Sequence, residues 1–549
     1  MSYPHTRRDD LVENLHGTDV ADPYRWLEDA DDPEVTAWVA AQRDFAEAAL
    51  GQLPARAWFA ELMGRIVARP RAGVPVKRGG RWFVSRNDGT TPQDVWYTAE
   101  TLDDLVAGGE VVLAPNTWSE DGTSSLSTFS VARDGSLMAY ARSDGGSDWQ
   151  RIRVRDLATG EDLDDEVTAK FSSPGWLPDH RSFLYTTYDQ AADARGPATE
   201  GLGVARLMVH RLDGDDEHLL SFPDEPHTMG CGQVSHDDAW LVVSIVRGTE
   251  NTNRVWAYPI TTADGRSTLG EPVKVVDVAD AEYGFVRVDG SQLYLQTDLD
   301  APLGRVVRVD LDWAARGDVE FAEVVPERRA TLAAVEAAGP GLLLAHLDDA
   351  QPVVEYCELD GTNPQPVDLP AGALVALDSS PLRDEAFVGI STLDAPTAAF
   401  HVTLPTGEAG PVVERVELAA SGVASFAPAH TTTRERATSA DGTEVPYFLV
   451  TPDDGRTGPR PTLLWGYGGF KIPIFADYRP GWSAWLAAGG AIAIANLRGG
   501  DEFGTAWYDA GRLAHKQNVF DDVIGVAEHL VAIGATTPGQ LALYGRSNG

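Results

Sequence analysis

LALYGRSNG, residues 541–549, joins a short apolar run to the motif Gly-x-Ser-x-Gly. A buried strand that ends in this motif turns sharply at the glycines and presents the serine at the carboxyl edge of a sheet. The motif alone arises often by chance, so the strand before it gives the pattern its weight. The segment therefore predicts that Ser547 is a nucleophile.

Residues 428–549, which end with this segment, alternate between strand and helix patterns. A hairpin is expected at Asp441-Gly442, and the apolar runs 463–465 and 491–495 are typical of buried parallel strands. A helix is expected after Asn518, with a buried stripe made of Phe520, Val523, Ile524, Ala527, Leu530 and Val531. This alternation predicts a parallel sheet with helices on both faces.

A nucleophilic serine needs donors for the oxyanion that forms when it attacks a carbonyl group. The backbone N–H of Asn548, directly after the serine, is one expected donor. The loop Trp-Gly-Tyr-Gly-Gly-Phe at 465–470 offers the second, because its glycines permit close approach of the Tyr467 phenol. A tight turn without a catalytic role is the competing interpretation of this loop.

Residues 69–427 have almost no helical periodicity. A turn with Asp or Gly followed by an alternating apolar strand recurs at 131–143, 176–188, 234–246 and 288–298. The turn aspartates, Asp134, Asp179, Asp237 and Asp289, recur at a period near 50 residues, as blades of a β-propeller do. The region therefore predicts a propeller of about seven blades. A row of β-sandwiches is the alternative.

The first 68 residues predict a helical segment, in which Pro33 begins a helix behind the acidic residues Asp31 and Asp32. The start of the chain has no apolar stretch typical of a signal peptide, and no apolar run is long enough to span a membrane.

The composition excludes several classes of function. The formal net charge of −39 argues against nucleic acid and anionic membranes as partners. Cys231 and Cys357 form neither a disulfide framework nor a zinc motif, which favours a reducing, cytoplasmic location. The acidic stretch 161–166 is expected to be a solvated loop. We expect no metal and no organic cofactor.

Five strings together identify the chain as similar to the prolyl oligopeptidase family: Asp-Pro-Tyr-Arg-Trp-Leu-Glu-Asp at 22–29, WGYGGF at 465–470, NLRGGDEFG at 496–504, HKQNVFDD at 515–522 and GRSNG at 545–549. The resemblance implies a seven-bladed propeller that caps an α/β-hydrolase domain, with the N-terminal segment packed on the hydrolase. It also implies a serine endopeptidase that acts on short peptides, cuts after proline and forms an acyl-enzyme. We expect a monomer.

By the same resemblance, Ser547 is the nucleophile, and Tyr467 and the Asn548 amide form the oxyanion hole. Phe470 would line the pocket for the proline ring. Phe171 and Arg254 resemble propeller residues that face the active site, although a buried aromatic residue and a surface arginine are the common alternatives.

In α/β-hydrolases the acid and the histidine follow the serine in the chain, and no residue follows Gly549 here. His515 and His529 are the nearest upstream histidines, and neither has the required position. We therefore expect a fragment of a longer protein that has no peptidase activity by itself.

Two other functions stay open at this stage. One is another propeller-capped hydrolase, such as an esterase or an acylaminoacyl-peptidase relative. A dipeptidyl peptidase is disfavoured, because the Glu-Glu pair typical of those enzymes does not occur in the chain. The other is a propeller scaffold for protein interactions with a vestigial hydrolase domain.

Overall fold

The computed structural model describes residues 3–29, 31–188, 203–212, 214–405, 410–418 and 426–549. The chain up to Val67 forms one compact unit, and the described residues from Ala68 onward form a second. The first unit contains β1 (Val12–Leu15), β2 (Thr18–Ala21), the 3-10 turn η1 (Arg25–Glu28), α1 (Pro33–Leu50) and α2 (Arg56–Val67).

The helix expected at Pro33 is confirmed, and the carboxylate of Asp32 caps it by accepting a hydrogen bond of 2.7 Å from the backbone N–H of Glu34. The expectation that the whole segment is helical is wrong for residues 12–21. These residues pair as an antiparallel hairpin, because His16 and Gly17 both adopt positive φ angles and make a two-residue turn.

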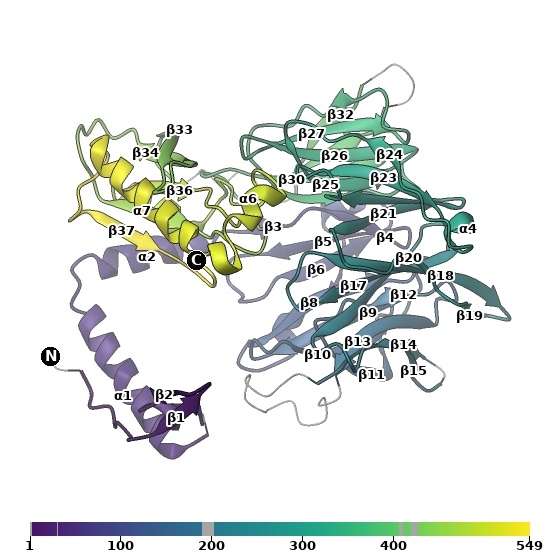
Figure 1. Cartoon of the computed structure of the whole chain (residues 1–549), viewed down its shortest axis with the longest axis horizontal. Coiled ribbons are helices and arrows are strands. Elements are labelled where there is room, and N and C mark those ends of the chain that lie inside the picture. Colours follow the sequence, from purple (N-terminus) through teal and green to yellow (C-terminus); the bar gives the residue numbers. More distant parts are fainter. Residues whose placement is uncertain (1–2, 30, 189–202, 213, 406–409, 419–425) are drawn as a thin grey trace. The chain divides into compact units, whose positions relative to one another are not determined.

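Residues 71–416 form seven antiparallel sheets, one after another along the chain, and so a seven-bladed β-propeller. Figure 1 labels most of their strands. Blades one to four comprise β3 (Arg71–Ala72), β4 (Val76–Arg78), β5 (Arg81–Asn87), β6 (Val95–Ala99), β7 (Glu110–Leu113); β8 (Ser124–Val131), β9 (Leu137–Asp144), β10 (Trp149–Asp156), β11 (Asp162–Lys170); β12 (Gly175–Trp176), β13 (Ser182–Tyr188), β14 (Ala205–Arg211), β15 (Glu217–Ser221); and β16 (Thr228–Val234), β17 (Trp240–Arg247), β18 (Asn253–Ala263), β19 (Arg266–Leu269), β20 (Val273–Val276).

Blades five to seven comprise β21 (Tyr283–Asp289), β22 (Gln292–Thr297), β23 (Arg305–Asp310), β24 (Ala322–Val325); β25 (Thr331–Ala338), β26 (Gly341–Asp348), β27 (Gln351–Glu358), β28 (Gln365–Pro366); and β29 (Ala373–Asp378), β30 (Glu385–Ser391), β31 (Ala398–Thr403), β32 (Val412–Val416). Short helical segments between these strands are α3 (Leu102–Ala107), η2 (Pro115–Thr117) and α4 (Leu311–Ala314). The sandwich alternative is wrong, because the seven sheets follow one another along the chain as the blades of one propeller.

The recurring sequence pattern has a structural origin. In the second to fourth blades the turn aspartate lies between the first two strands, whereas Asp289 of the fifth blade is the last residue of β21. The apolar run after each aspartate is the second strand, for example β9 and β13. The carboxylates of Asp134 and Asp179 accept backbone hydrogen bonds of 3.0 Å from residues two positions later, and Asp237 accepts one of 3.2 Å in the same way. The second, third and fourth blades therefore share the same local turn chemistry.

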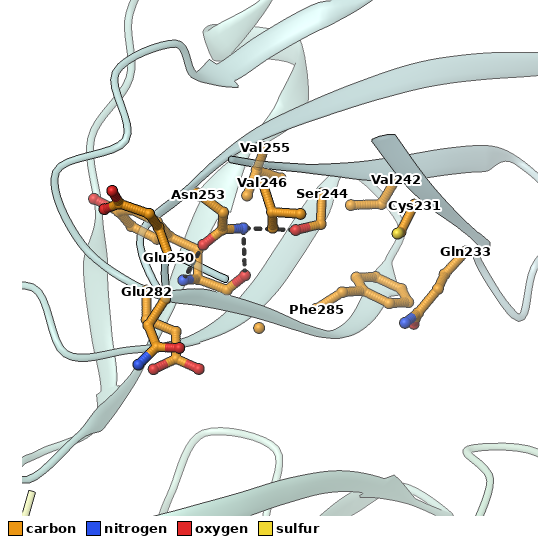
Figure 2. Close-up of a pocket in the computed structure, with 13 residues that line it drawn as sticks. Cys231, Gln233, Val242, Ser244, Val246, Glu250, Asn253, Val255, Glu282 and Phe285 are labelled. Atoms are coloured by element: carbon orange, nitrogen blue, oxygen red, sulfur yellow. Dashed lines mark hydrogen bonds between the residues drawn. The ribbon is translucent and has the colours of Figure 1, made fainter. Parts of the chain in front are cut away.

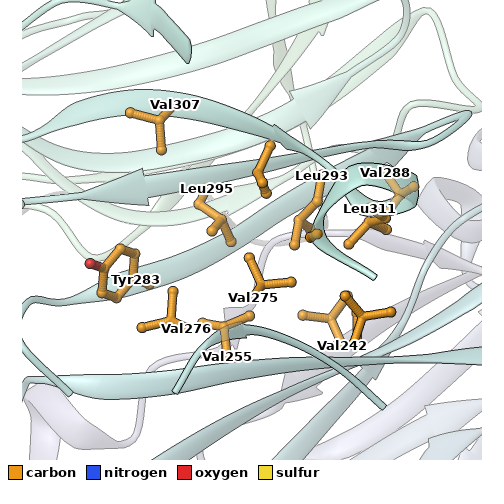
Figure 3. Packing of buried hydrophobic residues seen from close by; sticks show 14 of the residues in the cluster. Val242, Val255, Val275, Val276, Tyr283, Val288, Leu293, Leu295, Val307 and Leu311 are labelled. Carbon is orange, nitrogen blue, oxygen red and sulfur yellow. The ribbon is translucent and has the colours of Figure 1, made fainter. Parts of the chain in front are cut away.

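Adjacent blades are held together by apolar side chains. Figure 3 shows one such core, in which Val242 and Val255 of the fourth blade lie against Leu293 and Leu295 of the fifth. These four side chains are at most 2% exposed, and burial of this kind is the main favourable contribution to folding. The seven blades therefore provide a rigid platform.

Residues 430–544 contain a five-stranded sheet in the order β33-β34-β36-β35-β37. The elements are β33 (His430–Thr438), β34 (Glu444–Pro452), β35 (Thr462–Gly466), α5 (Pro480–Ala487), β36 (Ala491–Ala495), α6 (Thr505–Asp509), η4 (Leu513–His515), α7 (Gln517–Ala532) and β37 (Leu541–Tyr544). β35, β36 and β37 are parallel, and β33 and β34 form the expected hairpin, with Gly442 at φ 87°.

Each face of this sheet has its own core. Ala491, Ala493 and Ala495 of β36 point toward α7, whereas Ile492 and Ile494 point toward the side of α5. The continuous apolar run of β36 therefore follows from burial on both faces. Figure 1 shows α7 beside β33, β34 and β36.

The predicted buried stripe of α7 is only partly correct. Phe520 and Ile524 are 54% and 53% exposed, whereas Val519, Val526 and Leu530 are buried. The helix turns this other face toward the sheet because Asp522, which is fully buried, pairs with Arg498 beneath it.

None of the described helices is long and apolar enough to cross a membrane.

Candidate active site

Ser547 lies in the sharp turn that follows β37. Its φ angle is 55°, in the left-handed region that costs energy for a residue with a side chain. A Cβ atom on Gly545 would collide with the carbonyl oxygen of Gly549, and one on Gly549 would lie 2.6 Å from the oxygen of Gly466. The motif glycines are therefore required by close packing, and the strained serine has the conformation of a nucleophile elbow.

The loop after β35 contacts this elbow through Asn548. The Asn548 side-chain amide donates hydrogen bonds to the backbone oxygens of Tyr467 and Gly468, at 2.7 Å and 3.2 Å. A Cβ atom on Gly469 would lie 2.5 Å from the same amide nitrogen. The two segments that the sequence singled out, 80 residues apart, therefore lie against each other.

Lys516, just before α7, contacts both the Tyr467 loop and the elbow. Its Nζ atom donates hydrogen bonds to the Gly468 oxygen at 2.7 Å and to the Asn548 Oδ1 atom at 3.1 Å. Burial lowers the pKa of Lys516 from its ordinary value. Lys516 therefore joins the Tyr467 loop to the elbow through Gly468 and Asn548.

Phe470 is 47% exposed and its ring lies 6.5 Å from that of Tyr467, measured between ring centroids. An exposed aromatic ring in this loop is available to pack on a ligand. Its role in binding a proline ring stays a prediction.

The two propeller residues have local partners. Phe171 follows β11 at φ 51°, is 46% exposed and contacts the ring of Tyr188 edge-on. Arg254 forms an ion pair of 2.7 Å with Glu225 and lies over the ring of Phe222. Neither common alternative fits these residues, because Phe171 is not buried and the Arg254 side chain is only 16% exposed. The substrate contacts of both residues stay predictions.

Neither of the two upstream histidines forms a hydrogen bond with Ser547 among the contacts of the described residues. His529 in α7 shares a hydrogen bond of 2.8 Å with the Tyr447 hydroxyl, on the buried side of the sheet. His515 ends the 3-10 turn η4. Among the residues that the structure describes, no side chain forms a hydrogen bond with the Ser547 hydroxyl.

A cavity of about 320 Å³ opens between the fourth and fifth blades. Figure 2 shows Cys231, Gln233 and Phe285 at one end of it and Glu282 at the other. Asn253 joins the two blades there, because its side chain donates to the Ser244 hydroxyl at 2.8 Å and accepts from the Tyr283 N–H at 2.7 Å. Burial raises the pKa of Cys231, which keeps its thiol protonated.

Sequence reasoning missed Lys516 and the cavity. Lys516 belongs to the string HKQNVFDD, which supported the family resemblance without any role for its members. The cavity has no local sequence signal, since its lining comes from four different strands and the segments between them.

Across the described parts of the chain, no group of three or more His, Cys, Asp or Glu side chains is arranged to hold a metal ion.

Comparisons with known proteins agree with this geometry. Residues 4–415 match the family model of the prolyl oligopeptidase N-terminal β-propeller domain, and residues 478–549 match that of the prolyl oligopeptidase family. The chain is 29% identical to the prolyl endopeptidase of Elizabethkingia miricola and 30% identical to that of Elizabethkingia meningoseptica. Each alignment covers 100% of this chain and 76% of the relative.

Solved structures show the same likeness. A chain from an analysis of two prolyl endopeptidases superposes with a TM-score of 0.87 at 34% identity, over 100% of this chain and 79% of the other. Prolyl oligopeptidase B from Galerina marginata, bound to a 35-residue hydrolysis and macrocyclization substrate, gives a TM-score of 0.90 at 26% identity with the same coverage. With its propeller, its sheet and its elbow in place, the chain belongs to the prolyl oligopeptidase family of serine peptidases.

Proposed function

We propose that this chain carries the nucleophile and the oxyanion hole of an endopeptidase that cleaves short peptides on the carboxyl side of proline. The contact of the Ser547 elbow with the Tyr467 loop through Asn548 carries the proposal. The similarity to proteins named prolyl endopeptidase and prolyl oligopeptidase A supports it.

In the proposed reaction the Ser547 oxygen attacks the carbonyl carbon of the proline residue and transfers its proton to a base. The tetrahedral oxyanion accepts hydrogen bonds from the Asn548 N–H and the Tyr467 hydroxyl. The C–N bond then breaks, the amine leaves with the proton, and water hydrolyses the acyl-enzyme. We place the base and its carboxylate partner outside these 549 residues, because no described histidine reaches Ser547.

The 549-residue chain is therefore expected to show no turnover of a chromogenic peptide that contains Gly-Pro. Turnover should appear when the part of the Elizabethkingia miricola relative that lies outside the matched 76% of that protein is fused to the chain. Ser547→Ala should abolish turnover of the fusion protein. Turnover by the unfused chain that Ser547→Ala removes would show that the chain holds its own base.

Binding tests the preference for proline without a complete catalytic triad. Phe470→Ala should weaken the binding of a blocked Gly-Pro peptide about tenfold, because the exposed ring no longer packs on proline. Replacing the proline of the peptide by alanine should have a similar effect on the wild-type chain, and the two changes should not add. Isothermal titration calorimetry measures all four dissociation constants.

Phe520→Ala is the matched control, since Phe520 is 54% exposed on α7 and should leave the affinity unchanged. Equal affinity of the wild-type chain for the proline and alanine peptides would contradict the proposed specificity. We include Phe171 and Arg254 as proposed peptide contacts from the propeller.

We further propose a monomer in the cytoplasm. The support is that Cys231 and Cys357 are both free thiols, as in proteins of reducing compartments.

A further inference from the structure

The loop that carries Tyr467 and Phe470 adopts an uncommon backbone conformation. Phe470 and the next residue, Lys471, have φ angles of 55° and 56°, and neither is a glycine. Consecutive residues of this kind persist only where the surrounding structure holds them. One backbone hydrogen bond of 3.1 Å, from the Lys471 N–H to the Gly499 oxygen, supports this turn from the loop that follows β36.

The Lys471 side chain reaches the propeller. Its Nζ atom lies 2.6 Å from Glu282 Oε2 and 3.1 Å from Asp298 Oδ2, and the side chain is only 11% exposed. Glu282 immediately precedes β21 and Asp298 immediately follows β22, so both carboxylates come from one edge of the fifth blade. The Asp298 carboxylate also accepts hydrogen bonds from the Thr505 hydroxyl at 2.6 Å and from the Glu282 N–H at 2.8 Å.

This cluster keeps the lysine charged. Burial by itself would lower the pKa of Lys471, but the surrounding carboxylates of Glu282, Asp501 and Asp298 outweigh it and raise the pKa. The Lys471–Asp298 pair is the buried part of the cluster, since Asp298 is 14% exposed and Glu282 is 46% exposed. A buried ion pair is costly to break from one side, because the remaining charge loses its partner. The attachment of this loop to the fifth blade is therefore stronger than that of an exposed ion pair.

We infer that Lys471 is a positioning residue, which uses two carboxylates of the fifth propeller blade to hold Tyr467 and Phe470 in their conformation. The meaning of that position for catalysis rests on the proposed function. The loop that carries Tyr467 and Phe470 therefore adopts its conformation only when the fifth propeller blade contacts it through Lys471.

A second ion-pair group between the same two parts of the chain provides a comparison. Arg434 and Arg436 of β33 each lie 2.9 Å from Asp349, and these three side chains are 23%, 49% and 40% exposed, respectively. This group involves no residue of the Tyr467 loop. Its loss should weaken the contact between propeller and hydrolase without an effect on the loop.

Hydrogen exchange of the 549-residue chain, measured by mass spectrometry, tests the inference. Lys471→Met should increase the exchange rate of residues 467–472 by about tenfold or more, because the strained turn opens more often. The propeller variant Glu282→Gln/Asp298→Asn should have the same effect, although it leaves the loop sequence intact. Lys471→Arg should retain protection, and Asp349→Asn should leave the loop unchanged.

Protection of α7 in every variant shows that the hydrolase sheet is folded. Unchanged exchange of 467–472 in the propeller variant, or an equal increase in Asp349→Asn, would overturn the inference. Peptide binding by the wild-type chain is measured separately. Its absence would count against the proposed function, whereas the exchange result would still decide the role of Lys471.

Discussion

Arg498→Met is expected to lower the free energy of unfolding of the hydrolase sheet by about 3–5 kcal/mol. The Arg498 side chain is 4% exposed, and its Nη2 atom lies 2.6 Å from Asp522, which is fully buried in α7. Arg498 also donates to the Asp441 carboxylate and, at 3.0 Å, to the Ser439 hydroxyl. Burial opposes its charge, yet the hydrogen bonds with Asp522 and Asp441 outweigh burial and raise its pKa.

The large effect follows from what the substitution leaves behind. Without the guanidinium group, Asp522 is a buried carboxylate with no countercharge, and the hairpin turn at Asp441 loses its link to α7. Urea denaturation followed by hydrogen exchange of α7 measures the loss. Arg498→Met/Asp522→Leu should regain part of the stability, because the double variant removes both charges.

Arg512→Met is the matched control for this prediction. Arg512 pairs with Asp509 at 2.8 Å, but the two side chains are 37% and 51% exposed, so the loss should be at most about 1 kcal/mol. If Arg498→Met and Arg512→Met were equally stable, the buried pair would not hold the hairpin, the sheet and α7 together.

Glu502→Gln is expected to change how stability depends on pH. The Glu502 side chain is 1% exposed, and its Oε1 atom accepts hydrogen bonds from the Ile474 N–H at 2.8 Å and from the Asn496 side chain at 3.1 Å. No described residue donates to its Oε2 atom. Burial is the largest effect and raises the pKa of Glu502 from 4.5 to about 7.

The sign of the effect follows from proton binding. Between pH 4.5 and about 7 the folded protein retains a proton on Glu502 that the unfolded chain releases. This group therefore stabilises the fold fully below pH 4.5, and its contribution falls as the pH rises through that window, by about 3 kcal/mol in total. Glutamine carries no titrating proton, so Glu502→Gln should gain stability relative to the wild type over the same range.

Denaturation midpoints at pH 4.5, 5.5, 6.5 and 7.5 measure this difference. The carboxyl of Asp501 also has its pKa raised to about 7 by burial, so the wild-type profile contains both groups and only the comparison isolates Glu502. Glu528→Gln, on the exposed face of α7, should leave the slope unchanged. Parallel profiles for Glu502→Gln and the wild type would show that the buried carboxyl is ionised throughout.

Much of the architecture could be predicted from local patterns. The hairpin at Asp441-Gly442 and the buried strand 491–495 are each determined by a few neighbouring residues, and the structure confirms both. The face of α7 could not be predicted this way. Its apolar residues extend beyond the buried stripe, and the burial of Val519 rather than Phe520 depends on the ion pair between Asp522 and Arg498.

In the candidate site, too, local features could be predicted from the sequence and long-range contacts could not. The sequence by itself determined the type of each group: a serine in a glycine turn after a strand, and a tyrosine in a glycine loop after another strand. Such features are local, because they depend on φ angles and on residues a few positions apart. Only the tertiary structure decided that Asn548 and Lys516 join the two segments and that Lys471 reaches the fifth blade. Those contacts join residues 32 to 189 positions apart, and such pairings depend on the packing of the whole sheet against the propeller.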